Sequence, residues 1–525
     1  MKFSAKYRRK ICFVLAVLLA CLPMLFSCKD TGKTNDNGAH GLRGEDGSWT
    51  NVDFGGAELV VEVSARADEE VTFPATDIYT KGPDETTTDE IQKKVLARNA
   101  RVQSELGITV RYRESYCQVI EVFEHISKYV QGADEDAPDV IDNDIYGLVR
   151  AMMAGHLWNI SDPGVDTDGN EVYSYLDLEQ EGWYTDYMKG ATFDPQKMYL
   201  LAGDYHIDLI RFAWVLFTNV DMFDEVYSTT EYGSYEEFCE YLMATNDFFY
   251  SDLITLSRMG WRDDGKTKNE TDFEDSRIGL CLNNNAPRIF LFGCGHSMVE
   301  WSGGAFGEGT PSVVASGSEG ASMLEKVSKQ YTELFNGEGV HFITTILEST
   351  TEFFDGNIIF TMSVLGEMES QQMRETDFKR GIVPFPRYNS AAPDFCTVVH
   401  DQAEISCILN NTTSFTAATA YLQFINENSA DVLQEYYERG LKFKYNENKT
   451  VRRMIDFVKE HIVSPFDSVM ALYLCGVSDS KVQLYSILQE QAVNENNAFA
   501  STYYQHVGGY EKALRESLEM MEQIP

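Results

Sequence analysis

Residues 260–267 spell GxxxxGKT, the pattern of a phosphate-binding loop whose backbone N–H groups cradle phosphates. Asp263 and Asp264 would repel phosphates inside such a loop, and the segment after Thr267 is a poor helix start. We therefore interpret this stretch as an Asp- and Gly-rich loop that binds no phosphate.

A second stretch, residues 166–170, resembles the start of a calcium-binding loop. The full pattern would need acidic ligands where Gly164 and Tyr175 stand, so a solvated acidic loop is the simpler interpretation. We expect no cofactor. A calcium ion at residues 166–170 or 263–275 is the alternative.

The motifs HExxH, GxSxG, CxxC and GxGxxG do not occur in the sequence. Metalloprotease, serine hydrolase and dinucleotide chemistry therefore have no local support, and we expect that the protein is not an enzyme. A glycoside hydrolase is the alternative, because two carboxylates at the right separation suffice for that reaction and 82 acidic residues would hide such a pair.

The net charge of the sequence limits the kinds of partner that the protein can bind. The 525 residues include 43 basic and 82 acidic side chains, which gives a net charge of -39. Sequence-wide attraction to nucleic acid phosphates is implausible at that charge, so we expect no nucleic acid partner. The hydrophobic fraction of 43% is ample for packed cores, and the length suits two or more domains.

The N-terminus predicts export. Residues 1–10 carry five basic side chains, and residues 11–26 form an apolar run too short for a confident membrane span. Residues 25–28, Leu-Phe-Ser-Cys, resemble the lipobox of bacterial lipoproteins. We predict a signal peptide over residues 1–27 and lipid attachment at Cys28, which would anchor the protein to the cell membrane on its extracytoplasmic side. An ordinary secretory signal is the alternative.

Composition separates a linker from the folded body. Residues 28–56 are rich in Gly, Asp, Asn, Thr and Ser, which predicts a flexible tether. The cysteines beyond Cys28 are odd in number and scattered, which does not suggest a disulfide framework; only Cys281 with Cys294 is worth testing as a pair.

Hydrophobic periodicity then alternates between strand and helix. Predicted strands cover residues 58–64, 108–112 and 138–141, and predicted helices cover residues 89–106, 116–130 and 146–154. This alternation predicts an α/β fold with a parallel sheet covered by helices on both faces. The last third is mostly helical, with amphipathic stretches at residues 415–426, 430–439, 450–461 and 481–492.

An ordered series of segments across nearly all of the chain after the leader resembles an extracellular solute-binding protein of the sugar-binding group, family 1 type. Such proteins are lipoprotein components of ATP-binding-cassette importers. The segments that carry the resemblance are residues 97–99, 105–110, 138–146, 155–162, 198–203, 215–223, 354–362, 381–388, 397–403 and 436–445.

The resemblance implies a two-lobed periplasmic-binding-protein-like fold of type II. Each lobe would be a mainly parallel sheet flanked by helices, and hinge segments would cross between the lobes near residues 203–212, 357–362 and 398–403. Lobe one would comprise residues 57–205 plus 358–398. Lobe two would comprise residues 206–357 plus 399–525.

The resemblance also implies a function. The protein would capture a carbohydrate by closing its cleft, and would deliver it to an ATP-binding-cassette permease. The length of the chain favours an oligosaccharide, and we expect a monomer. A ligand-presenting subunit of a sensor, with the same fold and another partner, is a further alternative.

The ligand residues are expected where such proteins place them, at strand ends and crossings. Sugars need aromatic faces for their C–H surfaces and polar side chains for their hydroxyl groups. The candidates are Asp144 and Tyr146 after the third strand, Asp204, Tyr205, His206 and Asp208 in the first crossing, Asp401 in the last crossing, and Trp183, Trp261 and Trp301 as stacking residues in lobe two. For each, a helix cap or a core position is the competing interpretation.

Overall fold

The computed structural model describes residues 38–65, 76–84, 86–132, 134, 136–165, 169, 171–262, 276–293, 295, 297–315, 317–390, 394–444, 448–495 and 498–524. These residues belong to one compact unit. The predicted signal peptide, Cys28, Cys294, residues 263–275 and most of the loop at 166–170 lie outside them. Within the described ranges, no helix combines the length and apolar character that a membrane crossing requires.

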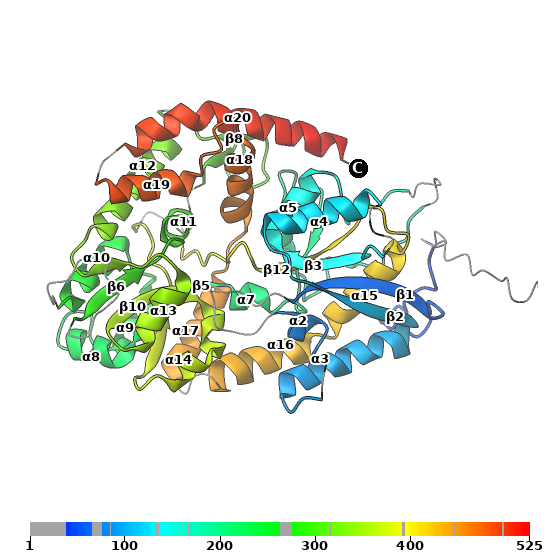
Figure 1. Ribbon diagram of the computed structural model, residues 1–525, viewed down its shortest axis with the longest axis horizontal. Helices are drawn as coiled ribbons and strands as arrows, with labels where there is room; N and C mark the ends of the chain where they lie inside the picture. The colour runs from blue at the N-terminus through cyan, green and yellow to red at the C-terminus, as the bar shows by residue number, and fades with distance from the viewer. Residues whose placement is uncertain are drawn as a thin grey trace, which may run out of the picture. The chain divides into compact units, whose positions relative to one another are not determined.

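The first of two five-stranded sheets has the strand order β2-β1-β3-β12-β4 (Figure 1). Its strands are β1 (Ala57–Ser64), β2 (Ile108–Ser115), β3 (Val140–Asp144), β4 (Leu200–Leu201) and β12 (Glu404–Ile408). Strand β1 is parallel to β2 and β3, whereas β12 is antiparallel to both of its neighbours. Four strands therefore run in one direction and β12 runs against them.

The second sheet repeats this pattern with the order β11-β5-β10-β6-β9. Its strands are β5 (Trp214–Asn219), β6 (Ile278–Leu282), β9 (Val340–Phe342), β10 (Ile358–Val364) and β11 (Arg380–Val383). Here β5 is the antiparallel strand, between β10 and β11. Every residue of β5 and β10 is buried, as expected for sheets covered on both faces. A separate hairpin joins β7 (Val299–Trp301) to β8 (Pro311–Val313).

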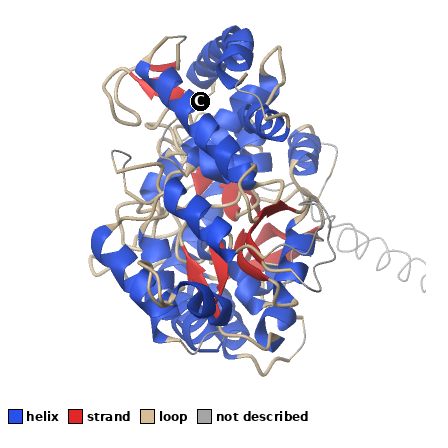
Figure 2. Ribbon diagram, turned by 90° about the vertical axis from the view of Figure 1, so that its left-hand side faces the viewer, coloured by secondary structure: helices blue, strands red, loops and turns tan. Residues whose placement is uncertain are grey.

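Helices cover both sheets, and Figure 2 shows the strands enclosed between them. We call each sheet with its packed helices a lobe. The helices up to the second sheet are α2 (Asp77–Thr80), α3 (Glu90–Arg101), α4 (Ile120–Val130), α5 (Ile145–Met153), α6 (Thr185–Lys189) and α7 (Asp208–Arg211), with a π-helical turn η1 (Val102–Leu106). The helices of the second lobe are α8 (Val220–Tyr227), α9 (Tyr235–Thr245), α10 (Tyr250–Gly260), α11 (Ala286–Phe292), α12 (Glu319–Phe335), α13 (Ile346–Phe354) and α14 (Gln371–Glu375), with a 3-10 turn η2 (Leu365–Glu369).

The remaining helices follow the last strand. They are α15 (Phe415–Glu427), α16 (Ala430–Gln434), η3 (Glu435–Lys444), α17 (Lys449–Glu460), η4 (Phe466–Met470), α18 (Ala471–Val477), α19 (Leu484–Val493) and α20 (Phe499–Gln523). Helix α15 packs on β1 of the first lobe, whereas α17 packs on α9 and β11 of the second. Helices α18 and α20 contact α5 of the first lobe, and α20 also contacts α12 and α19 of the second.

The predicted α/β class and the two mainly parallel, helix-flanked sheets are confirmed. The six predicted elements before residue 155 all form, with boundary shifts of a few residues. The predicted cap is also present, because the Asp89 carboxylate accepts hydrogen bonds from the N–H groups of Ile91 and Gln92. Gly107, at φ 66°, ends the helical stretch in the left-handed conformation that glycine tolerates.

The predicted lobe boundaries are wrong for the segments after residue 357. We assigned residues 358–398 to lobe one, but β10 and β11 both pair with β5 in the second sheet. We assigned residues after 398 to lobe two, but β12 pairs with β3 and β4 in the first. Apolar strands of similar composition fit either sheet, so the sequence pattern alone did not separate them.

Between elements that the structure describes, the chain passes from one lobe to the other after β4, after β11 and again between α15 and α17. We call these connections, at residues 202–213, between Val383 and Glu404, and between Glu427 and Lys449, the first, second and third crossings. The first of these and the predicted crossing at 398–403 are confirmed. The crossing predicted at residues 357–362 is wrong, because those residues begin the central strand of the second sheet.

The predicted tether is wrong for residues 38–56. Trp49, Val52 and Phe54 are buried; of the large apolar residues in this polar stretch, only Leu42 is exposed. The Trp49 indole N–H donates to a Glu427 oxygen at 2.8 Å, and the Phe54 N–H donates to the Leu106 carbonyl at 2.8 Å. These contacts attach residues 38–56 to the first lobe.

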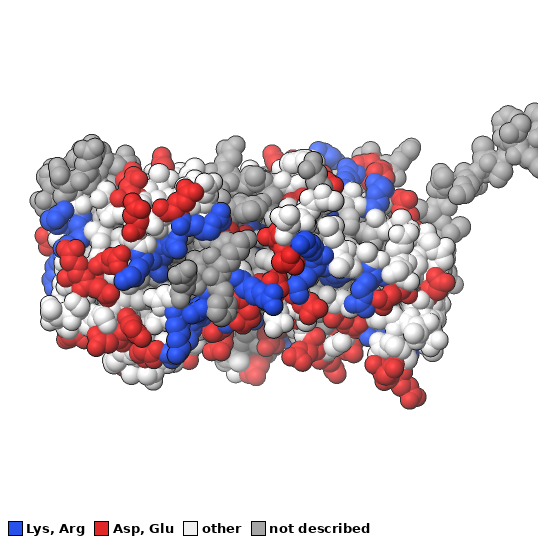
Figure 3. Space-filling model, turned by 90° about the horizontal axis from the view of Figure 1, so that it is seen from below, with Lys and Arg blue, Asp and Glu red and all other residues white. Residues whose placement is uncertain are grey.

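The acidic and basic side chains can be compared on one face of the molecule. Figure 3 shows Lys and Arg interspersed with Asp and Glu over the face seen from below. On the described part of this face, side chains of the two signs are therefore mixed.

Candidate functional site

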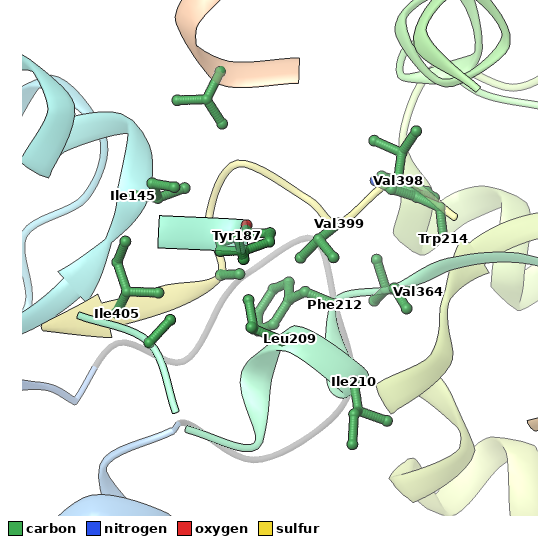
Figure 4. Close-up of a cluster of buried hydrophobic side chains, with 14 of the residues drawn as sticks. Ile145, Tyr187, Leu209, Ile210, Phe212, Trp214, Val364, Val398, Val399 and Ile405 are labelled. Carbon is green, nitrogen blue, oxygen red and sulfur yellow. The ribbon is translucent and has the colours of Figure 1, made fainter. Parts of the chain in front are cut away.

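Two of the crossings run side by side between the lobes. Ala213 and Val399 form an antiparallel bridge, the Trp214 N–H donates to the Val398 carbonyl at 2.9 Å, and the His400 N–H donates to the Phe212 carbonyl at 2.9 Å. Buried apolar side chains surround them, from Ile145 and Ile405 of the first lobe to Val364 of the second (Figure 4). The crossings are thus a packed element rather than loose linkers.

The carboxyl ends of strands from both sheets meet these crossings. Strand β3 ends at Asp144, and the next N–H, of Ile145, donates to the Ala403 carbonyl at 3.1 Å. Strand β10 ends at Val364, and the next N–H, of Leu365, donates to the Ala213 carbonyl at 2.8 Å. In α/β folds this edge is where ligands bind.

Polar and aromatic side chains from both lobes gather here. We call them the interlobe cluster; its members are Tyr146, Arg150, Arg288, His400, Asp401, Tyr473 and Tyr485. They come from α5 of the first lobe, from α11, α18 and α19, and from the second crossing.

Short contacts hold the interlobe cluster together. The Tyr146 N–H donates to the Asp401 carbonyl at 3.2 Å, and an Arg150 Nη donates to the Tyr146 hydroxyl at 2.5 Å. The Arg150 guanidinium also lies over the rings of Tyr146 and Tyr473, at 4.6 and 5.8 Å from their centroids. One arginine thus links a helix of the first lobe to a helix near the C-terminus.

Asp401 carries the negative charge of the interlobe cluster. Its carboxylate forms an ion pair with the Arg288 guanidinium, and His400 Nδ1 lies 3.0 Å from its other oxygen. Burial would raise the pKa of Asp401, but Arg288 and His400 outweigh it and hold that pKa well below its usual range. Burial raises the pKa of Tyr485, which is near enough to Arg288, Asp401 and Tyr146 to feel their charges. Asp401 therefore stays ionised and Tyr485 stays neutral at neutral pH.

A groove of about 330 Å³ is the second candidate site, and we call it the interlobe groove. It is lined by Trp183, Tyr184, Thr185, Asp186 and Tyr187 of the first lobe, Leu209 and Ile210 of the first crossing, and Lys459, Ile462, Val463 and Ser464 of the second lobe. Burial raises the pKa of Tyr187, and the charge of Asp401 in the interlobe cluster raises it further. The volume is within the usual range for a small-molecule site, roughly 300–1,000 Å³.

A larger depression of about 740 Å³ is lined only by residues of the second lobe, between Ser228 and Asp252. Because no first-lobe residue lines it, a ligand there would not bridge the lobes. The interlobe groove and the interlobe cluster are therefore the stronger candidates.

Three of the predicted ligand residues belong to these two sites, and a fourth, Asp204, contacts a residue that lines the groove. Tyr146 and Asp401 are in the interlobe cluster, and Trp183 lines the groove. Trp183 bridges to Gly203 beside β4, so it belongs to the first lobe and not to lobe two as predicted. Asp204 lies behind the groove, where it accepts a hydrogen bond from the Tyr184 hydroxyl at 2.9 Å; burial raises its pKa.

Three other predicted ligand residues have structural partners instead. Asp144 caps α5 by accepting from the Gly147 N–H at 2.8 Å, and it also accepts from the Val119 N–H at 2.7 Å. Tyr205 and His206 are buried against Ser406, which the Tyr205 hydroxyl meets at 2.8 Å and His206 Nε2 at 3.1 Å. For these residues the competing interpretation, a cap or a core position, describes what the structure shows.

Asp208 belongs to a buried ion network, which we define as Thr76, Tyr79, Asp208, Arg211, Glu369 and Tyr436. Arg211 lies 3.0 Å from the Asp208 carboxylate and 2.9 Å from that of Glu369. The Tyr79 and Tyr436 hydroxyls donate to Glu369 at 2.9 and 2.6 Å, and Thr76 donates to Asp208 at 3.0 Å. The network joins the first crossing, η2 of the second lobe and η3 of the third crossing.

The remaining two tryptophans lie elsewhere. Trp261 follows α10 at the amino-terminal edge of the second sheet, where its ring packs against His341 at 4.9 Å. That edge is opposite to the crossings. Trp301, in the β7–β8 hairpin, packs edge-on against Phe306 at 5.3 Å and against Phe466 at 5.9 Å.

Arg150, Tyr473 and Tyr485 were not predicted. Arg150 follows Tyr146 by one helical turn, so the spacing on α5 could have indicated it. Tyr473 and Tyr485 come from distant helices, and no local pattern connects them with α5. Among the described residues, no group of three or more His, Cys, Asp or Glu side chains could hold a metal ion.

No protein-family model matches the chain, and no curated protein matches it in sequence. Solved structures do resemble it. The GacH receptor of Streptomyces glaucescens GLA.O, solved unliganded and with acarbose, is 12% identical at a TM-score of 0.49, over 88% of this chain and 99% of that one.

A maltose/maltodextrin-binding domain, MalE, from Bdellovibrio bacteriovorus bound to maltotriose is 12% identical at a TM-score of 0.46, over 89% of this chain and 100% of that one. UgpB from Mycobacterium tuberculosis, in complex with glycerophosphocholine, is 13% identical at a TM-score of 0.49, over 82% and 97% of the two chains. At such TM-scores these likenesses decide neither ligand nor mechanism.

Proposed function

We propose that the protein captures a carbohydrate between its two lobes and delivers it to an ATP-binding-cassette permease. One observation carries the proposal: the carboxyl ends of strands from both sheets meet at the crossings, and residues of both lobes line the interlobe groove there. Tyrosine and tryptophan rings suit the C–H faces of sugars, and the carboxylates, guanidinium groups and hydroxyls beside them suit sugar hydroxyl groups.

The mechanism follows from the position of the site. A ligand that touches both lobes makes all of its contacts only when the lobes approach, so binding favours the closed arrangement. The crossings would absorb this motion as a hinge. A permease that recognises the closed arrangement would then distinguish loaded from empty protein, and no bond in the ligand need break.

The remaining parts of the proposal come from the sequence. Lipid attachment at Cys28 would hold the protein, as a monomer, on the extracytoplasmic side of the cell membrane. Replacement of Cys28 by alanine should release the protein from the membrane fraction. We also propose that no cofactor is needed, so a chelator should leave the unfolding midpoint unchanged.

A thermal-shift screen with a panel of oligosaccharides tests the proposal. A ligand at 100 times its Kd adds about 2.7 kcal/mol to the free energy of unfolding, which raises Tm by a few degrees. The proposal expects such a shift for one class of sugar, with the sugar recovered intact. Cleavage of the sugar would favour the glycoside hydrolase, and no shift with any saccharide would contradict carbohydrate binding.

A further inference from the structure

Arg150 lies between two aromatic rings and has no carboxylate partner among the described residues. Its side chain is half-buried between the rings of Tyr146 and Tyr473, and its Nε is fully buried. The Tyr146 hydroxyl accepts one of its hydrogen bonds, and Nε has no acceptor. No residue that the structure describes forms an ion pair with it.

Two further arginines at the crossings, Arg288 and Arg211, are neutralised by carboxylates, whereas Arg98 is buried with its guanidinium bonded to Ser429 and to the Tyr79 and Thr80 carbonyls. Arg288 pairs with Asp401, and Arg211 lies between Asp208 and Glu369. The interlobe cluster contains two guanidinium groups and one carboxylate, so one positive charge is left over. In a chain with a net charge of -39, an arginine without a carboxylate partner in such a place requires an explanation.

A purely structural role is the competing explanation. Arg150 lies beside the last turn of α18, because a Cβ on Gly476 would be 3.1 Å from its Nη2. The C-terminal end of a helix carries partial negative charge and favours a nearby cation. This accounts for part of the charge, but no carbonyl of that turn accepts a hydrogen bond from Arg150, and its buried Nε stays unsatisfied.

We propose that Arg150 is the receptor for an acidic group on the ligand, and that the protein binds a uronate-containing saccharide through the carboxylate of one sugar unit. The inference rests on the proposed function, since it places this carboxylate in the interlobe cluster. The planar guanidinium fork matches a carboxylate, and the flanking rings of Tyr146 and Tyr473 hold the fork in place.

The leftover charge also favours a carboxylate over a phosphate ester. A carboxylate carries one negative charge and would balance Arg150 alone. A phosphate ester carries up to two, and the second arginine of the interlobe cluster, Arg288, is already neutralised by Asp401. Phosphorylated sugars are therefore the weaker candidates, and the test includes them.

Pairs of ligands that differ only in charge test the proposal. Trimers of glucuronate, galacturonate and mannuronate are each compared with their methyl esters by calorimetric titration of the full chain. Maltotriose and glucose 6-phosphate complete the panel. For at least one trimer we expect the acid to bind about 10- to 100-fold more tightly than its ester, which is the usual value of a charge-assisted hydrogen bond.

Three variants separate recognition from folding. In Arg150→Gln the ratio between acid and ester should fall to about one, whereas Arg150→Lys, which keeps the charge without the fork, should keep part of it. Arg258→Gln removes the same charge from an exposed site on α10 and should keep the whole ratio. The Tm of each unliganded variant shows whether it is folded.

Several outcomes would overturn the inference. Equal binding of acid and ester, an Arg150→Gln variant that binds the acid as tightly as the parent, or binding of glucose 6-phosphate without any uronate would each do so. Tight binding of maltotriose with none of the uronates would overturn it while the proposed function stands. If neither acidic nor neutral saccharides bind, both fail.

Discussion

The interlobe cluster and the buried ion network use the same side-chain chemistry close to the same crossings, with opposite results. In the buried ion network, Arg211 lies 3.0 and 2.9 Å from two carboxylates, and tyrosine and threonine hydroxyls satisfy the remaining oxygens. In the interlobe cluster, Arg150 has two aromatic rings, one hydroxyl and no carboxylate among the described residues.

We interpret the difference as that between a structural site and the proposed binding site. Fully paired buried charges fix the arrangement of the segments that carry them, and they leave no donor for a ligand. An arginine without a carboxylate partner keeps that capacity. Asp208, which the sequence indicated as a ligand residue, is completely buried in the buried ion network and therefore belongs to the structural site.

The largest expected effect is on stability, from removing the charge at the centre of the buried ion network. Arg211→Met leaves the carboxylates of Asp208 and Glu369 buried without their cation, so the free energy of unfolding should fall by about 3–5 kcal/mol. Urea denaturation measures it.

Arg150→Met is the matched control, because it deprives no carboxylate of a partner and should cost less than about 1 kcal/mol. Equal losses in the two variants would remove the distinction between the two regions. Adding Asp208→Asn and Glu369→Gln to Arg211→Met should recover part of the stability.

An intermediate effect is expected at Asp467 of η4, a carboxyl whose Oδ1 is buried without a partner. Burial raises its pKa from 3.8 to about 6. The folded state therefore holds this proton more tightly than the unfolded chain, and the stability it provides below pH 4 is lost as the pH rises to 6.

Asp467→Asn should remove that dependence. At pH 7 the variant should be more stable than the parent by about 1–3 kcal/mol, and at pH 4 the two should agree. Urea denaturation at both values gives the comparison. A parent and variant of equal stability at pH 7 would show that Asp467 is solvated or paired.

The smallest effect is expected at Trp261, on the edge of the second sheet away from the crossings. Trp261→Ala should leave the ligand-induced Tm shift unchanged, whereas Tyr473→Ala should reduce it, because Tyr473 lies against Arg150 and Trp261 packs on His341 instead. A lost shift in the Trp261 variant would move the ligand away from the interlobe cluster.

The sequence predicted local structure well because the signals were local. The cap at Asp89, the stop at Gly107 and the apolar strands on either side follow from residues a few positions apart. The order of strands in the sheets depends on contacts distant in sequence, so β10 and β12 were placed in the wrong lobes.

The same limit applies to the site. Tyr146 and Asp401 could be chosen from their positions at a strand end and a crossing, and both belong to the interlobe cluster. Asp208 pairs with Arg211 three residues on in α7, a spacing that could have indicated the pair. Arg150 was missed because Tyr473, one of the two rings beside it, comes from a helix distant in sequence.

Amide hydrogen exchange, with and without the saccharide panel, tests most directly whether ligand binds between the lobes. We predict slower exchange in residues 145–153 of the first lobe together with residues 286–292 and 471–493, because these segments carry the interlobe cluster. Protection confined to one lobe, such as residues 228–252 alone, would contradict a ligand site that bridges the two.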